Sequence, residues 1–122
     1  MATAEMIAPM IAAAAAATRF WEQGDELGYR ALAHPDLEMR IPSAGVVLTG
    51  LDSIWNLRKL GGEQPLAIHS QHSAYVTGST VVALTTIYSR ETGAPTQHAE
   101  CKYTFGVGGK IVLYEQEILW RA

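Results

Sequence analysis

Residues 96–120 read TQHAECKYTFGVGGKIVLYEQEILW, and this segment decides the fold. Apolar and polar residues alternate along residues 96–107 and again along residues 110–120, on either side of the pair Gly108-Gly109. Alternation with a period of two is typical of β-strands that have one buried face, and a glycine pair is typical of a tight turn between two strands. The segment therefore predicts a β-hairpin of two long antiparallel strands.

The residues before this hairpin predict three helices and further strands. We expect helices at residues 4–23, 26–33 and 53–60, strands at residues 37–42, 67–76 and 80–90, and a loop at residues 43–50. The first helix follows from an apolar stripe at three- and four-residue steps, made up of Ile7, Met10, Ile11, Ala14, Ala17 and Trp21. Helices followed by an antiparallel meander are typical of an α+β plan, so we expect a single α+β domain over residues 1–122.

Strand alternation assigns one face of the hairpin to the helices, because successive side chains point to opposite sides of a sheet. This face consists of Ala99, Cys101, Tyr103, Phe105, Tyr114, Gln116, Ile118 and Trp120. The space between sheet and helices is where such a plan can hold a ligand. Gln116 is the most informative member of the set, since a buried amide must hydrogen-bond to protein, water or a ligand.

The composition excludes several classes of function. The chain has 122 residues, of which 48% are hydrophobic and 17% charged, with a formal net charge of −3. Basic residues are scattered rather than gathered on one face, so we expect no nucleic-acid partner. Cys101 is the single cysteine, which rules out an intramolecular disulfide and leaves a reducing cytoplasm as the expected location.

An alanine-rich run at residues 6–17 raises the question of a membrane or export segment. It is too short to cross a bilayer, which takes about 20 apolar residues. A signal peptide begins with basic residues, whereas this run is preceded by Glu5 and by no lysine or arginine. We therefore expect a helix that belongs to the domain, and no membrane partner.

Three stretches of the chain carry a resemblance to a known superfamily. They are EQGD at 22–25 followed by LAHPDL at 32–37, RIP at 40–42 with GLDSI at 50–54, and YTFGVGGKI at 103–111. In this order and spacing they resemble the nuclear transport factor 2-like superfamily, with its SnoaL-like polyketide cyclases, ketosteroid isomerase, limonene epoxide hydrolase and scytalone dehydratase. The resemblance implies a cystatin-like α+β barrel, a cone of curved, mostly antiparallel sheet around N-terminal helices and a hydrophobic pocket. It also implies a homodimer.

Two of these enzymes have catalytic residues with no counterpart here. By spacing, the base, the oxyanion tyrosine and the protonated aspartic acid of ketosteroid isomerase fall on Ile41, Ala17 and Cys101. The arginine and two aspartates of limonene epoxide hydrolase fall near Leu84, Thr86 and Gln116. Aliphatic side chains and a neutral amide cannot carry the proton transfers that these reactions need. We therefore expect neither activity in its usual form.

The dehydratase and dehydrochlorinase branch of the superfamily fits the chain better. Its enzymes pair an acid at the end of the first helix with a histidine on the strand after the third helix, and a histidine held by a carboxylate is a sound general base. The resemblance puts Glu22 at the first position and His69 or His72 near the second. We take Glu22 and His72 as the candidate catalytic pair, while which histidine faces the pocket stays open. A solvated glutamate and a structural histidine are the alternative reading.

The candidate ligand-binding residues are aromatic, basic or polar: Trp21, Arg40, Trp55, Arg58, Cys101, Tyr103, Tyr114 and Gln116. Either arginine would suit a ligand carboxylate or would lie in water above a packed stem, and the aromatic residues would also serve as core. No metal is expected, because His69 and His72 are three apart in a strand and point to opposite faces. No cofactor is expected either.

Two functions of different classes follow. The first is a cofactor-independent lyase, isomerase or hydrolase of the SnoaL-like kind, which performs elimination, isomerisation, cyclisation or hydration on a small apolar molecule. The second is a non-catalytic ligand-binding or dimeric accessory protein with the same fold. The enzyme requires a titratable group inside the pocket. The sequence alone does not decide between them.

Overall fold

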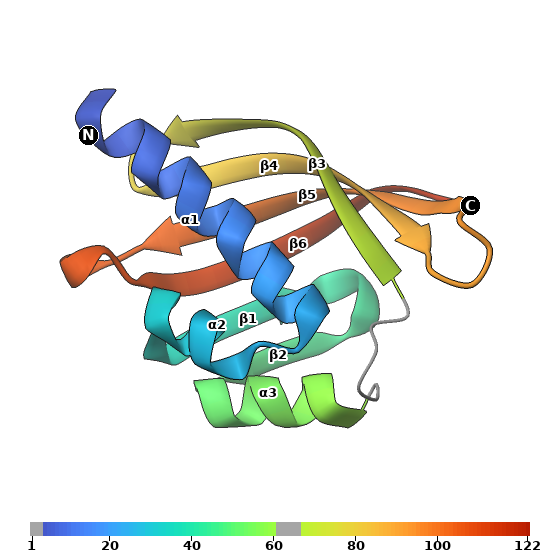
Figure 1. Cartoon of the computed structure of the whole chain (residues 1–122), viewed down its shortest axis with the longest axis horizontal. Helices are drawn as coiled ribbons and strands as arrows, with labels where there is room; N and C mark the ends of the chain where they lie inside the picture. The colour runs from blue at the N-terminus through green and yellow to red at the C-terminus, as the bar shows by residue number, and fades with distance from the viewer. Residues whose placement is uncertain (1–3, 61–66) are drawn as a thin grey trace.

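Six strands form one curved sheet in the order β2-β1-β6-β5-β4-β3 (Figure 1). The computed structural model describes residues 4–60 and 67–122. The strands are β1 Ala33–Ile41, β2 Val46–Thr49, β3 Ala67–Thr77, β4 Thr80–Ser89, β5 Pro95–Phe105 and β6 Ile111–Arg121. All neighbouring strands pair antiparallel except β1 and β6, which are parallel. The predicted hairpin of residues 96–120 is thus the pair β5–β6 at the centre of the sheet.

Three α-helices accompany the sheet: α1 Ala4–Gln23, α2 Glu26–Leu32 and α3 Leu51–Leu60. α1 lies across one face of the sheet, and α2 and α3 lie near β1 (Figure 1). The apolar stripe of α1 buries Met10, Ala14 and Ala17, which recur at three- and four-residue steps as an amphipathic helix requires. No helix in the described ranges is long and apolar enough to cross a membrane.

The junction between α1 and α2 follows directly from the local sequence. Gly24 ends α1 with a φ of 70°, a left-handed conformation that favours glycine. The side chain of Asp25 then caps α2 by accepting a hydrogen bond of 2.9 Å from the backbone N–H of Gly28. This sharp junction sets the end of α1, and with it Trp21 and Glu22, close to the sheet.

The observed strand β2 was not predicted, since residues 43–50 were expected to be a loop. Val46–Thr49 forms β2 and pairs antiparallel with residues 38–41 of β1. Gly45, at a φ of 67°, supplies the turn that brings the segment back onto β1. Two smaller differences are that β1 already begins at Ala33 and that α3 begins at Leu51.

The prediction that Trp120 faces the helices is wrong. The pairing of β5 with β6 shifts by one residue between His98 and Ala99, so that His98 lies opposite Trp120 while Ala99 lies opposite Ile118. The extra residue, Leu119, interrupts the alternation and moves Trp120 to the other face of the sheet. There its ring lies 4.9 Å from that of His98, and the residue is 45% exposed.

Candidate functional site

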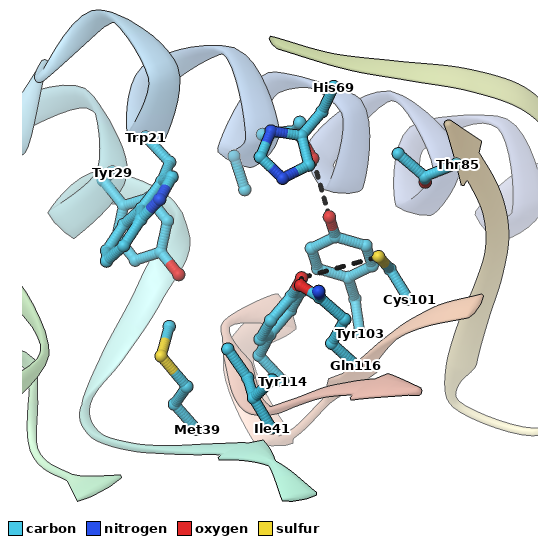
Figure 2. A pocket seen from close by; sticks show the side chains of 12 residues that line it. Trp21, Tyr29, Met39, Ile41, His69, Thr85, Cys101, Tyr103, Tyr114 and Gln116 are labelled. Carbon is cyan, nitrogen blue, oxygen red and sulfur yellow. Dashed lines mark hydrogen bonds between the residues drawn. The ribbon is translucent and has the colours of Figure 1, made fainter. Parts of the chain in front are cut away.

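A cavity of about 60 Å³ lies between α1 and the concave face of the sheet (Figure 2). Its walls come from α1, α2 and five strands, and twelve residues line it: Ala17, Thr18, Trp21, Tyr29, Met39, Ile41, His69, Thr85, Cys101, Tyr103, Tyr114 and Gln116. Apolar walls with a few polar tips are the usual composition of a small-molecule site. The cavity is therefore the candidate functional site.

The hairpin β5–β6 supplies one wall of this cavity. Cys101 lies opposite Gln116 in the strand register, and Tyr103 lies opposite Tyr114. All four side chains line the cavity, and the two tyrosine rings lie 5.1 Å apart. Period-two alternation explains the arrangement, because residues two apart in each strand share a face. The structure thus brings these four sequence-predicted residues together, while their role in ligand binding stays a prediction.

Glu22 and His69 form a hydrogen-bonded pair between α1 and β3. Oε1 of Glu22 accepts a hydrogen bond from the backbone N–H of His69 and lies 3.1 Å from Nδ1 of the same residue. Each side chain is 19% exposed. A carboxylate next to Nδ1 favours a proton on that nitrogen and leaves the lone pair on Nε2. The second ring nitrogen points toward the interior of the cavity in Figure 2.

His72 does not lie with Glu22, which corrects the pairing expected from the sequence. His69 pairs with Ile87 and Gln71 with Thr85, so these two residues of β3 face the cavity side. His72 sits at a register shift on the other face, where Nε2 bonds to the Thr86 hydroxyl. His69, and not His72, is therefore the histidine that lies beside Glu22.

The structure places neither Arg40 nor Arg58 on the cavity wall. Arg40 alternates with the cavity residues Met39 and Ile41, so it points the other way and pairs with Glu38 at 3.0 Å. Arg58 is buried, and it donates from Nε to the carbonyl of Trp21 at 2.8 Å and from its terminal nitrogen to the carbonyl of Glu22 at 3.3 Å. These bonds satisfy carbonyls that the end of α1 leaves without helical partners.

Trp55 supports the cavity from behind and does not line it. It is only 2% exposed, and its ring lies 5.3 Å from Trp21 and 5.5 Å from Tyr29, both of which line the cavity. Trp21 and Tyr29 are themselves 5.8 Å apart, so the three rings form one aromatic cluster. Of the two tryptophans predicted to bind ligand, only Trp21 reaches the site.

Burial keeps the tyrosine and cysteine side chains of the cavity in their neutral forms. It raises the pKa of Tyr103, of Tyr114 and of Tyr29 well above the ordinary phenol value. Burial also raises the pKa of the Cys101 thiol, with smaller opposing effects from Tyr114 and Thr85. A thiol held protonated is a poor nucleophile, which favours a packing role for Cys101. The tyrosines are neutral hydroxyl groups at physiological pH.

Several lining residues escaped the sequence prediction, and Thr18 matters most among them. Its hydroxyl lies 2.6 Å from the Tyr103 hydroxyl. The signal was present, since Thr18 directly follows Ala17 and lies one turn after Ala14, both in the apolar stripe of α1. Among the described residues, no group of three or more His, Cys, Asp or Glu side chains is arranged to hold a metal ion.

Comparison with known proteins identifies the fold but no close relative. No protein-family model and no curated protein sequence matches the chain. An NTF-2 like protein of unknown function from Burkholderia xenovorans LB400 is similar in structure, with a TM-score of 0.72 and 18% identity over 93% of this chain and 86% of that chain. A protein of unknown function with a cystatin-like fold, from Nostoc punctiforme, has a TM-score of 0.73 and 17% identity, over 88% of this chain and 86% of that chain.

An enzyme-like protein is among the similar structures. A Kribbella flavida protein proposed to be a ketosteroid isomerase has a TM-score of 0.74 with 11% identity, over 95% of this chain and 82% of that chain. Identities this low establish a shared fold and leave the chemistry to be argued from the site. The chain thus has the α+β fold of the nuclear transport factor 2-like, cystatin-like proteins, as its sequence motifs predicted.

Proposed function

We propose that this protein is a cofactor-independent acid/base enzyme that acts on a small, uncharged, largely apolar molecule held in the cavity. In this proposal His69 is the general base, and Glu22 orients and stabilises it. One observation carries the proposal. His69 lines the cavity, and its Nδ1 lies 3.1 Å from Oε1 of Glu22. The reaction classes that such a pair serves are elimination, isomerisation, cyclisation and hydration.

The pair has the parts that a proton transfer needs. Nε2 of His69 takes a proton from the substrate, and the resulting imidazolium is stabilised by the carboxylate of Glu22 on its other side. The same nitrogen then returns the proton to the leaving group or to another atom of the substrate. The amide nitrogen of Gln116, on the opposite wall, is available to donate to an oxygen on which negative charge develops.

The lining favours an uncharged substrate. None of the twelve lining residues is a lysine, arginine, aspartate or glutamate. A buried ion without a partner is costly, so a carboxylate or ammonium substrate would be disfavoured here. The volume of about 60 Å³ is well below the roughly 300–1,000 Å³ of sites for drug-sized ligands. We therefore expect a substrate of few heavy atoms, or movement of lining side chains on binding.

The test is a turnover screen in D₂O with small neutral alcohols, ketones and alkyl chlorides, followed by NMR. An active base exchanges a carbon-bound proton with solvent or forms an eliminated or rearranged product. We expect catalysed exchange or product formation with at least one compound class. Compounds that bind in the cavity but show neither exchange nor product would contradict the proposal and favour a non-catalytic ligand-binding protein.

A further inference from the structure

We infer that the hydrogen bonds around Tyr103 fix this tyrosine as an acceptor, so that the cavity selects ligands that present a hydroxyl group over ligands of the same shape that present a carbonyl. The inference specifies the substrate class of the cavity and therefore rests on the proposed function. It reverses the usual expectation for a buried tyrosine at such a site, which is to donate its proton to a substrate oxygen.

The argument begins at Thr18, which has a single proton to give. Its hydroxyl lies 3.2 Å from the carbonyl oxygen of Ala14, which can only accept, so Thr18 donates there. The side-chain nitrogen of Gln71 donates to the same hydroxyl at 3.4 Å. The remaining contact is the one of 2.6 Å with Tyr103. Because the Thr18 proton is directed to Ala14, we assign Tyr103 as the donor in this contact.

This assignment turns the Tyr103 proton away from the cavity. Tyr103 has one proton, and burial raises its pKa, so that proton stays in place. The side chain of Gln71 also hydrogen-bonds to the Tyr103 oxygen, so this oxygen offers its remaining lone pair to a ligand. The Tyr103 hydroxyl points toward the region of the cavity where the His69 ring lies (Figure 2). His69, whose Nδ1 faces Glu22, also presents a lone pair there. The Tyr103 oxygen and Nε2 of His69 therefore both act as acceptors toward a ligand, and neither donates a proton to it.

The proton of Tyr114, on the neighbouring strand, is also used within the protein. Its hydroxyl donates to Oε1 of Gln116 at 2.8 Å, while the sulfur of Cys101 lies farther away, at 3.5 Å. The donors that remain for a ligand are the amide nitrogen of Gln116 and the hydroxyl of Thr85. Thr85 is buried, lines the cavity, and has no nitrogen or oxygen partner within the described part of the chain, so its hydroxyl contacts only the weakly accepting sulfur of Cys101. A buried hydroxyl without such a partner indicates a place for a ligand atom or water.

The ligand class follows from this division of donors and acceptors. A ligand hydroxyl at the Tyr103–His69 end gives its proton to a waiting acceptor. A ketone oxygen in the same place would meet two lone pairs and leave the buried acceptors unsatisfied. A further acceptor group on the ligand would be served by Gln116 or Thr85. The cavity is therefore set for a neutral alcohol.

The test compares cyclopentanol with cyclopentanone, which have nearly the same shape, by NMR titration of the wild-type protein. We expect cyclopentanol to bind about tenfold more tightly, as one buried hydrogen bond implies. Thr18→Val removes the acceptor for the Tyr103 proton, which then becomes available to a ligand carbonyl, so the preference should vanish or reverse. Thr18→Ser keeps the hydroxyl and should keep the preference, and Tyr103→Phe should abolish it.

Equal affinity of the wild-type protein for the two ligands would overturn the inference, as would an unchanged ratio in both Thr18→Val and Tyr103→Phe. Binding of neither ligand at millimolar concentration would also overturn it. The readout is binding and needs no turnover. If the protein prefers the alcohol but catalyses nothing, this inference stands and the proposed function is wrong. If the protein catalyses a reaction but shows no preference for the alcohol, the proposed function stands and this inference is wrong.

Discussion

Replacing His69 by glutamine is expected to lower kcat by about 10²–10⁴-fold on any substrate that the D₂O screen identifies. Glutamine keeps a polar side chain of similar reach but cannot take up a proton near neutral pH. KM should change little, because the glutamine side-chain oxygen can still accept from a substrate hydroxyl and the apolar walls are unchanged. The measurement is steady-state kinetics of the purified variant, after its unfolding curve shows that the fold is intact.

The chain contains a matched control for this prediction. His72 lies three residues further along the same strand, but it is exposed on the other face and bonded to Thr86. His72→Gln should therefore leave kcat within about twofold of the wild-type value, as is usual for a surface substitution. A His69→Gln enzyme with nearly full kcat, or an equal loss in His72→Gln, would place the base elsewhere.

Replacing Trp55 by alanine is expected to lower the free energy of unfolding by about 3–5 kcal/mol. Trp55 is 2% exposed and contacts the rings of Trp21 and Tyr29, so its removal leaves a large void behind the cavity wall. One effect moderates the loss. The Trp55 N–H is buried without a hydrogen-bond partner among the described residues, and its removal relieves that cost. We therefore expect a value near the lower end of the range, measured by urea denaturation.

Trp120 is the natural control for this substitution. It is 45% exposed and stacks on His98 at the other face of the sheet, away from the aromatic cluster. Trp120→Ala should cost less than about 1 kcal/mol, because little buried volume is lost. Similar losses for the two variants would show that the cluster of Trp21, Tyr29 and Trp55 does not support the cavity as described.

The sequence predicted the strands best where apolar and polar residues alternate regularly. Alternation along residues 96–120 was enough to put Cys101 and Tyr103 beside Tyr114 and Gln116, because a period of two leaves no other choice of face. The same rule failed for Trp120. A bulge adds one residue at Leu119, and nothing in the local sequence marks it.

The candidate catalytic pair shows a second limit. Spacing placed an acid at Glu22 and a histidine near residues 69–72, but the choice between His69 and His72 depends on which residues of β3 face inward. That phase is set by pairing with β4, which is a long-range contact. One residue of error exchanges the two faces of a strand, so the sequence left both histidines open.

The role of Arg58 and the strand β2 were not predicted correctly, because both depend on contacts between segments far apart in the sequence or formed only on folding. A basic residue on an amphipathic helix suits a ligand carboxylate equally well, yet here it hydrogen-bonds the last carbonyls of α1, an element 36 or 37 residues away in the chain. Val46–Thr49 lies between glycines and resembles a loop until β1 is available as its partner. Local propensity cannot reveal partners that only the folded chain brings together.

The most direct measurement of the central claim is the tautomer of His69. The claim is that Glu22 holds the proton on Nδ1 and leaves a lone pair on Nε2, where the cavity lies. A long-range ¹H–¹⁵N NMR spectrum of the ¹⁵N-labelled protein distinguishes the two nitrogens at a pH where the ring is neutral. The account predicts a protonated Nδ1 and an unprotonated Nε2, and loss of this strong preference in Glu22→Leu, which has no acceptor for the Nδ1 proton. A neutral ring protonated on Nε2 in the wild-type protein would contradict it, because His69 would then have no lone pair to act as a base in the cavity.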